Sequence, residues 1–261
     1  MTFLNDDEKR QSHKFLSKGY IISKVESRNS LEYIHQLIDK KINKILMNKK
    51  KINLNFLHKY INTIRLNDFR VELISELNKD QELRYHYFNI ARPSIYNLAG
   101  NELMMQKNIN LSIQLPNDDS SLLPIHSDVW SGDSPYEINL WVPLVDCYKT
   151  KSMYILEQKN LKYFLKKMKQ GKYYGSDKIF NLLKNKLKYL TIKNGQYLLF
   201  NQSLPHGNVV NLETETRVSM NCRFKSIFSP YGDKKIGEFF LPITTRAVTK
   251  SAFDFKFPFK I

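Results

Sequence analysis

Residues 123–144 read LPIHSDVWSGDSPYEINLWVPL and place a histidine and an aspartate, His126 and Asp128, two positions apart. The composition of this run is typical of strand and turn. On a strand, residues i and i+2 project from the same face, so the two side chains point together while Ser127 points away. Imidazole and carboxylate are both metal ligands, and the pair is therefore a candidate for two ligands of one metal site. The pair alone is a weak signal, because such pairs also occur by chance at turns and on surfaces.

The second half of the chain supplies a third candidate ligand. The segment GQYLLFNQSLPHGNVVN, residues 195–211, places His206 at a Pro-His-Gly corner directly after an apolar run. The next predicted strand, TRVSMNCRF at residues 216–224, carries Arg217 near its start, with Ser219 on the same face. Two adjacent ligands, a distant histidine and a basic residue beyond it form a coherent set.

A known chemistry needs such a set. Two histidines and one carboxylate fill one face of an iron(II) octahedron and leave three positions free. 2-Oxoglutarate can take two of these through its keto acid, and oxygen can take the third. The far carboxylate of 2-oxoglutarate then needs a fixed cation. Arg217 suits this role, because a guanidinium binds carboxylate bidentately and stays charged, and Ser219 can add a hydroxyl donor.

The sequence resembles the non-haem Fe(II)/2-oxoglutarate-dependent oxygenases, in particular their phytanoyl-CoA-dioxygenase-like branch. The resemblance covers most of the chain and is clearest from Arg92 to Phe228. The segments that carry it are IHSDVWSG, INLWVPLVD, GQYLLFNQSLPHGNVVN and TRVSMNCRF, with GYIISKV and RPSIYNLAG closer to the N-terminus. The longer segment HSDVWSGDSPYEINLWVPL also resembles oxygenases found in bacterial surface-carbohydrate gene clusters.

This resemblance implies a fold, a site and an activity. The implied fold is mixed with a mainly β core, a double-stranded β-helix (a cupin-like jelly roll) that follows N-terminal helices. By the family's pattern, His126, Asp128 and His206 would be the catalytic metal ligands, and Arg217 would bind the co-substrate. The cofactors would be Fe(II), 2-oxoglutarate and O₂. The implied activity is a dioxygenase that hydroxylates a small molecule, a sugar or sugar derivative, in carbohydrate or surface-polysaccharide biosynthesis.

Further residues are candidates for the same site, and each has a second interpretation. Gln114 and Asn139 lie on predicted strands that face the barrel interior, where each could hydrogen-bond 2-oxoglutarate or satisfy a buried polar neighbour. Arg223 shares a strand face with Arg217 and is an alternative clamp or a contact for a substrate anion. Trp130 could line the substrate entrance or cap the barrel. The remaining four histidines are interpreted as structural or surface residues.

Patterning predicts one domain, 1–261, with a mainly helical part at 1–107 and a jelly-roll core at 108–261. Helical periodicity is clearest at residues 6–19, 30–50 and 54–78. Predicted strands are residues 109–115, 137–145, 151–156, 189–193, 195–200 and 216–228. A lysine-rich helical insertion at about 158–190 interrupts the core, where the chain departs from the family's pattern. Its lysines either contact an anionic substrate or form a solvated face: Lys159, Lys162, Lys166, Lys167, Lys169 and Lys172.

The composition limits the possible partners. The chain carries 41 basic and 25 acidic side chains, a net charge of +16. Lysine is in excess over arginine beside abundant asparagine and isoleucine, which indicates compositional bias. We therefore expect a small-molecule substrate, favoured to be anionic by the positive field, and no nucleic acid. No apolar run is long enough to span a membrane.

The sequence also predicts a cytoplasmic protein. The charged N-terminus lacks the apolar region of a secretory signal. Cys147 and Cys222 have no CxxC spacing and are expected to be free thiols in a reducing compartment. The sequence gives no information on oligomeric state.

Two other functions remain open. The first is a jelly-roll, metal-dependent sugar isomerase or epimerase, which would need the metal ligands but no carboxylate clamp such as Arg217. The second is a non-catalytic basic module that binds nucleic acid or anionic glycan. Such a module would have no use for the three metal ligands.

Overall fold

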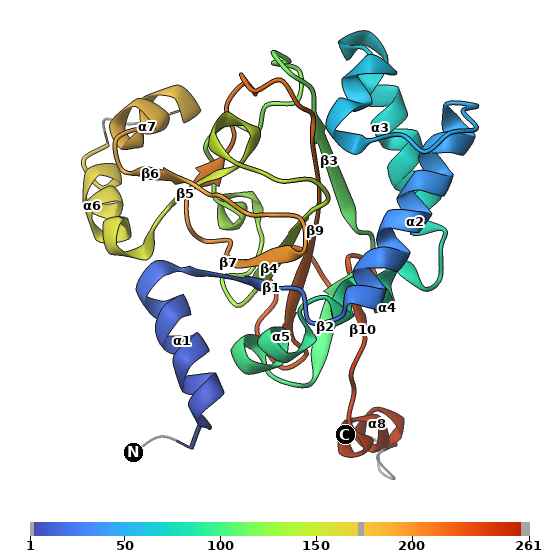
Figure 1. Ribbon diagram of the computed structural model, residues 1–261. Coiled ribbons are helices and arrows are strands. Elements are labelled where there is room, and N and C mark those ends of the chain that lie inside the picture. Colours follow the sequence, from blue (N-terminus) through green and yellow to red (C-terminus); the bar gives the residue numbers. More distant parts are fainter. Residues whose placement is uncertain (1–2, 172–174, 257–261) are drawn as a thin grey trace.

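The computed structural model describes residues 3–171 and 175–256, and Figure 1 shows an antiparallel sheet with helices around it. The helices are α1 (Asp6–Lys18), α2 (Arg28–Ile45), α3 (Thr63–Asn78), α4 (Leu83–Asn89), α5 (Arg92–Ala99), α6 (Gln158–Met168), α7 (Ser176–Leu183) and α8 (Ala247–Asp254), with short 3₁₀ turns η1 (Leu54–Lys59), η2 (Asp128–Ser131) and η3 (Lys149–Lys151). The strands are β1 (Tyr20–Lys24), β2 (Leu103–Gln106), β3 (Asn110–Gln114), β4 (Ile138–Pro143), β5 (Tyr154–Leu156), β6 (Leu187–Tyr189), β7 (Gln196–Asn201), β8 (His206–Gly207), β9 (Arg217–Ser226) and β10 (Phe240–Pro242).

The strands form two antiparallel sheets. The larger has seven strands in the order β1-β7-β4-β9-β2-β10, with β3 also paired to β9, and the smaller has the order β6-β5-β8. Strand β9 is central, because it pairs with β4 on one side and with β2 and β3 on the other. In the part of the chain that is described, no ladder between these strands closes the two sheets into a barrel. The expected mixture of helices and an antiparallel β core is confirmed at this level.

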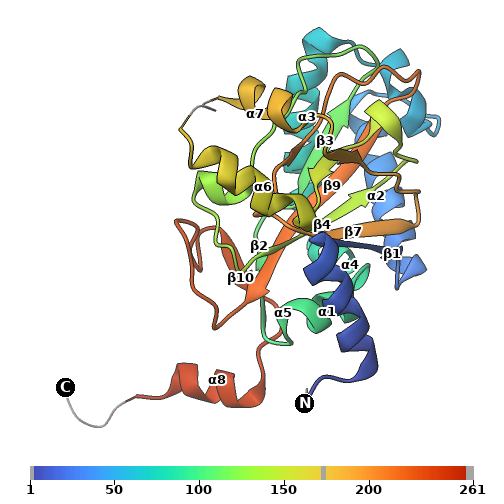
Figure 2. The same cartoon turned by 90° about the vertical axis from the view of Figure 1, so that its left-hand side faces the viewer.

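Helices α2 and α3 cover the large sheet from the side of β3 (Figure 1), whereas α1 lies near β1 (Figures 1 and 2). Helix α2 begins after Ser27, whose side chain accepts a hydrogen bond from the Ser30 amide, as a helix N-cap does. Its apolar side chains recur every three or four residues and are buried, including Ile34, Ile38 and Ile42. Helix α2 packs against α3 and α4, and α3 packs along the edge strand β3.

Most of the strongly periodic segments form the predicted elements. Helices α1 and α3 and strands β3, β4, β5 and β9 lie within the ranges predicted from the sequence, while α2 begins two residues before its predicted range and β7 ends one residue after it. The prediction for residues 189–193 was wrong in its bounds, since β6 ends at Tyr189 and Ile192 forms only an isolated bridge with Cys147. Strand β2 lies in the part predicted to be mainly helical. It is four residues long and depends on pairing with β9 and β10, a tertiary effect that local patterning does not reveal.

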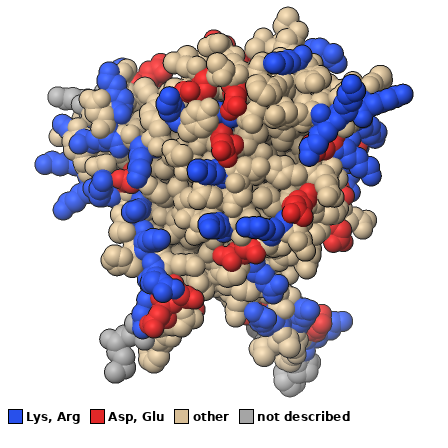
Figure 3. Space-filling view, in the orientation of Figure 1, with Lys and Arg blue, Asp and Glu red and all other residues tan. Residues whose placement is uncertain are grey.

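The insertion packs on the smaller sheet. Its helices α6 and α7 bury Phe164, Ile179 and Leu183 against Tyr154 and Leu156 of β5. The insertion is not helical throughout, because β6 occupies its last part. Figure 3 shows lysine and arginine side chains extending into solvent over this region, at the left. Lys172 lies outside the described residues.

Two further findings concern the ends and surface of the described chain. Helix α8 projects away from the sheets, as both ribbon views show. No described helix combines the length and apolar character required to span a membrane.

Gly19 connects α1 to β1 of the large sheet, and its substitution tests how closely this turn packs against Leu204. It has φ +84°, and a Cβ at this position would overlap the side chain of the fully buried Leu204. A non-glycine residue in such a backbone conformation costs about 1–3 kcal/mol before any overlap. Gly195 has φ +88° but open space around it, so it is a matched control. We expect Gly19→Ala to lower the free energy of unfolding in urea more than Gly195→Ala does. Equal losses would show that Leu204 does not constrain this turn.

Candidate metal centre

A main-chain bridge places His126 beside His206. The His126 amide donates to the His206 carbonyl at 2.9 Å, and the His206 amide donates to the His126 carbonyl at 2.8 Å. The two ring centroids are 4.3 Å apart. Each Nδ1 donates to the carbonyl two residues earlier, of Pro124 and of Leu204, at 2.8 Å. This arrangement puts the proton on Nδ1 and leaves both Nε2 atoms free to bind a metal.

Asp128 completes the group from a turn. We expected His126 and Asp128 on one regular strand, and this was wrong, because Asp128 begins the 3₁₀ turn η2. Its amide donates to the Gln202 carbonyl at 3.1 Å, which holds the turn close to the end of β7. Asp128 Oδ1 lies 3.4 Å from His126 Nε2 and 3.8 Å from His206 Nε2. The three ligand atoms lie within 4.8 Å of one another, a spacing that one metal ion can bridge.

The environment sets protonation states that suit a metal. Burial lowers the pKa of His206 to about 4, so this imidazole is neutral at pH 7. Burial alone would raise the pKa of Asp128, but the neighbouring side chains of His126, His206 and Arg223 together outweigh it and hold the pKa below its usual range. Burial alone would lower the pKa of His126, but the Asp128 carboxylate and the Pro124 carbonyl together outweigh it and the pKa is raised. An ionised aspartate beside a neutral imidazole is the form that a divalent metal binds.

Arg223 lies against the aspartate. Its Nη2 is 3.0 Å from Asp128 Oδ2, while Nε donates to Gln202 Oε1 at 2.9 Å and Nη1 to Gln106 Oε1 at 3.3 Å. The guanidinium thus faces one carboxylate oxygen and leaves Oδ1 for a metal. The sequence had suggested a second clamp or a substrate contact for Arg223. In the structure Arg223 lines the cavity and pairs with Asp128, a candidate metal ligand.

Two further charged side chains, Asp133 and Lys234, extend the ion-pair network from Arg223. Asp133 Oδ1 lies 3.8 Å from Arg223 Nε and 2.6 Å from Lys234 Nζ. Sequence reasoning did not single out Asp133, Lys234, Gln106 or Gln202. Nothing local in the sequence identifies these positions, because they come from four separate segments of the chain.

The three candidate ligands open into a cavity of about 480 Å³. Arg217 also lines it, is 3% exposed, and donates from Nη2 to Ser112 Oγ at 3.0 Å. Among the described residues no carboxylate pairs with this guanidinium, and its Nε has no partner. Burial accordingly lowers the pKa of Arg217. A buried charge without a counter-ion is costly, so the position is suited to binding an anion.

The other predicted residues divide into two groups. Asn139 lines the cavity, and its Oδ1 is buried without a hydrogen-bond partner among the described residues. Ser219 Oγ on β9 is also buried without such a partner, but Ser219 does not line the cavity. Gln114 donates to the Val209 carbonyl at 2.6 Å and does not line the cavity. Trp130 is also outside the lining, 48% exposed, with its ring 5.9 Å from that of Phe164. No described residue of α6 or α7 reaches the lining.

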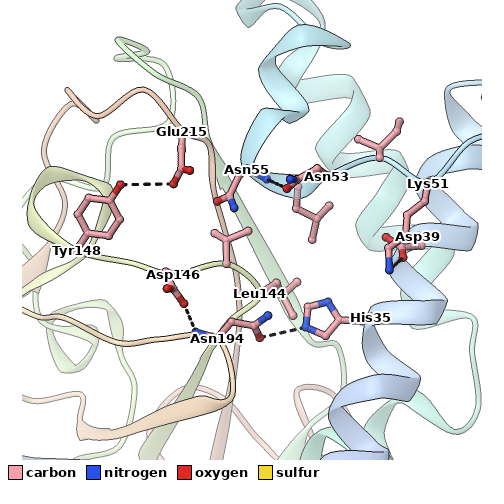
Figure 4. A pocket seen from close by; sticks show the side chains of 13 residues that line it. His35, Asp39, Lys51, Asn53, Asn55, Leu144, Asp146, Tyr148, Asn194 and Glu215 are labelled. Carbon is pink, nitrogen blue, oxygen red and sulfur yellow. Dashed lines mark hydrogen bonds and ion pairs between the residues drawn. The ribbon is translucent and has the colours of Figure 1, made fainter.

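A second cavity, of about 820 Å³, lies between α2, η1 and the segment after β4 (Figure 4). Its polar groups are already paired with one another. Lys51 lies 3.2 Å from Asp39, and the Asn194 amide donates to Asp146 at 2.8 Å. His35, one of the histidines expected to be structural, contacts the side chain of Asn194 at 3.2 Å. Because these groups are satisfied within the chain, the smaller cavity is the better candidate for a functional site.

Comparisons with known proteins agree with this fold. No protein-family model and no curated protein matches the sequence. A solved nickel complex of the non-heme monooxygenase ThoJ shares 13% identity over 90% of this chain and 84% of its own, with a TM-score of 0.59. The non-heme alpha ketoglutarate dependent carbocyclase SnoK shares 13% over 93% and 97%, with a TM-score of 0.55. HygX from Streptomyces hygroscopicus, with nickel and 2-oxoglutarate bound, shares 11% over 89% and 90%, with a TM-score of 0.52. At such identities the likeness is one of fold.

The contact between Arg223 and Asp128 makes a testable prediction. Removing a positive charge near the site would by itself strengthen the binding of a divalent metal ion. Losing a group that orients a metal ligand has the opposite effect and typically weakens metal binding by about 10- to 100-fold. We expect orientation to dominate, so that Arg223→Met weakens cobalt(II) binding in a competitive titration and Arg223→Lys recovers part of the loss.

Arg84→Met is the matched control for this experiment. Arg84 is half-buried and donates to the Met105 carbonyl at 3.3 Å, away from the cavity. The control should retain the metal affinity and the visible cobalt spectrum of the unaltered protein. An unchanged or tighter affinity in Arg223→Met would contradict the orienting role.

Proposed function

We propose that the protein is a non-haem Fe(II)- and 2-oxoglutarate-dependent dioxygenase that hydroxylates a small molecule. One observation carries the proposal. Two histidines and one aspartate converge at a cavity that also contains a buried arginine without a carboxylate partner. A facial triad with open positions needs the first feature, and a dicarboxylate co-substrate needs the second. We further propose that the two sheets are the walls of a cupin-like jelly roll.

In this proposal the chain supplies binding and orientation. His126, Asp128 and His206 would hold the iron, and Arg217 would bind the far carboxylate of 2-oxoglutarate. Asn139 lines the cavity with an unsatisfied buried oxygen that can take part in binding the co-substrate, whereas Ser219 lies behind the lining on the strand that carries Arg217. When bound, iron, 2-oxoglutarate and oxygen supply the oxidation of a substrate C–H bond. Arg223 would keep one oxygen of Asp128 occupied, so that this ligand takes only one position on the metal.

The structural neighbours support the same interpretation. HygX is solved with nickel and 2-oxoglutarate, and SnoK is described as alpha ketoglutarate dependent. Both share the fold of this chain over most of its length. The phytanoyl-CoA-dioxygenase-like branch, and a sugar or sugar derivative of surface-polysaccharide biosynthesis as the substrate, are proposals that rest on the sequence resemblance.

The alternatives account for fewer of these observations. A sugar isomerase or epimerase would use the metal ligands but leaves the buried, unpaired Arg217 without a role. A module that binds nucleic acid or glycan leaves the converged triad without one. A halogenase needs a chloride in the coordination position that Asp128 would fill.

The metal assignment predicts the behaviour of histidine variants. We expect His126→Ala and His206→Ala each to weaken nickel(II) binding by more than about a hundredfold, because even residues that only orient a ligand contribute 10- to 100-fold. Isothermal titration of the metal-free protein measures this. His13→Ala removes an exposed histidine of α1 and should bind nickel as the unaltered protein does. Unchanged binding in both triad variants would exclude the assignment.

The clamp assignment predicts a different pattern. Removing one partner of a buried, hydrogen-bonded charge pair costs about 2–5 kcal/mol. Arg217→Ala should therefore weaken 2-oxoglutarate binding to the nickel-loaded protein by about 30- to several-thousand-fold while nickel affinity stays the same. Arg65→Ala, on the exposed side of α3, is the control for loss of charge. If Arg217→Ala keeps the affinity of the unaltered protein for 2-oxoglutarate, another residue holds the co-substrate.

A further inference from the structure

The cavity contains a second arginine without a counter-ion, in addition to Arg217. Arg70 lies on α3, which packs along the edge strand β3, and it lines the cavity together with Ile74 one turn later. Its Nη2 donates to Asn67 Oδ1 at 2.8 Å, within the same helix. In the described ranges no carboxylate pairs with Arg70. Its Nε and Nη1 donors are left for a ligand.

Three paired side chains on neighbouring strands of the large sheet form a row that ends at β3, the strand next to the helix of Arg70. Trp141 of β4 pairs with Asn221 of β9, which pairs with Asn110 of β3. All three line the cavity, and within the described structure neither asparagine side chain has a hydrogen-bond partner. The row ends at β3, the strand that α3 covers. Free amide groups and a free guanidinium are thus neighbours at one wall.

The charges of the cavity indicate what this wall binds. The charged residues of the lining are Arg70, Arg217, Arg223 and Asp128. Asp128 and Arg223 pair with each other, and Arg217 is assigned to the far carboxylate of 2-oxoglutarate. The three arginines, Asp128, iron(II) and the doubly charged 2-oxoglutarate sum to a net charge of +2 in the loaded cavity. Arg217 contacts the co-substrate carboxylate in this proposal, so Arg70 is the arginine left without an anionic partner. A neutral substrate would leave this charge without a partner.

We infer that the substrate carries an anionic group, a carboxylate or a phosphate, which binds Arg70, while Asn110 and Asn221 hydrogen-bond its adjacent polar groups. The inference rests on the proposed function and names the class of substrate. The planar fork of arginine binds either anion through two donors. The anion site therefore lies at the β3 wall. The exposed lysines of α6, which sequence analysis had considered for this role, do not line the cavity.

Phosphorus NMR of inorganic phosphate tests the site without knowledge of the substrate. The protein is loaded with cobalt(II) and 2-oxoglutarate under argon, and phosphate is titrated. The unpaired electrons of cobalt broaden the phosphate resonance only when phosphate binds near the metal. We expect saturable broadening in the unaltered protein. Arg70→Gln should weaken phosphate binding by about tenfold or more, since a hydrogen bond to a charged group is lost. Arg65→Gln removes the same charge from the exposed side of α3 and should behave as the unaltered protein does.

Three results would overturn the inference. The first is absence of broadening in the unaltered protein. The second is full retention of broadening in Arg70→Gln, because phosphate would then bind the metal or Arg217. The third is a loss of 2-oxoglutarate affinity in Arg70→Gln with phosphate binding unchanged, which would assign Arg70 to the co-substrate.

A failure of the proposed function gives a different result. In that case cobalt or 2-oxoglutarate does not bind the unaltered protein in calorimetry. Titration of phosphate into the metal-free protein and into metal-free Arg70→Gln then tests the anion site alone. Arg70-dependent binding would support the site, and equal binding in both proteins would exclude it.

Discussion

The pair of main-chain hydrogen bonds between His126 and His206 is the constraint on which the candidate site depends. These bonds join two segments that are far apart in the sequence and belong to no common ladder, and they bring the two imidazoles to a centroid separation of 4.3 Å. The hydrogen bond from the Asp128 amide to the Gln202 carbonyl then places the Asp128 carboxylate close to the Nε2 atoms of both rings. Because each ring also donates from Nδ1 to a nearby carbonyl, the free nitrogens face the carboxylate rather than solvent. Backbone geometry thus organises the ligands before any metal is present.

The pairing of the buried charges indicates which part of the site can bind an anion. Arg223 is compensated by Asp128 and fixed by Gln202 and Gln106, so it contributes to the shape of the site. Arg217 is more deeply buried than Arg223 and has only a serine hydroxyl as its partner, which is costly unless an anion binds. Arg217 and Arg223, which lie on the same face of β9, therefore have different roles. Strand β9 carries Arg217, Asn221 and Arg223, which all line the same cavity, so one strand links the metal end and the anion end of the site.

The sequence identified three candidate ligands that the structure brings together, but it did not predict the local geometry that joins them. Helical periodicity in α2 follows from burial of one face, and the apolar and aromatic composition of β4 and β9 follows from burial of most of their side chains, so both patterns can be read locally. The expectation that Asp128 continues a strand was wrong, because a two-residue spacing does not distinguish a strand from an extended residue followed by a turn. Strand β2 and the partners of Arg223 could not be predicted, since each depends on contacts between distant segments. Arg70 gave no signal at all, because on the helix pattern of α3 it resembles an ordinary solvent-facing arginine.

The most direct test of the account is spectroscopic. Iron(II) chelated by a 2-oxo acid absorbs visible light through charge transfer from the metal to the ligand, and neither partner alone does so. If the triad leaves adjacent positions open and Arg217 holds the far carboxylate, anaerobic addition of 2-oxoglutarate to the iron-loaded protein will produce this absorption, saturating at one co-substrate per chain. Its absence at saturating 2-oxoglutarate, with iron shown to be bound, would contradict the claim that this site is built for a 2-oxoglutarate-dependent oxygenase.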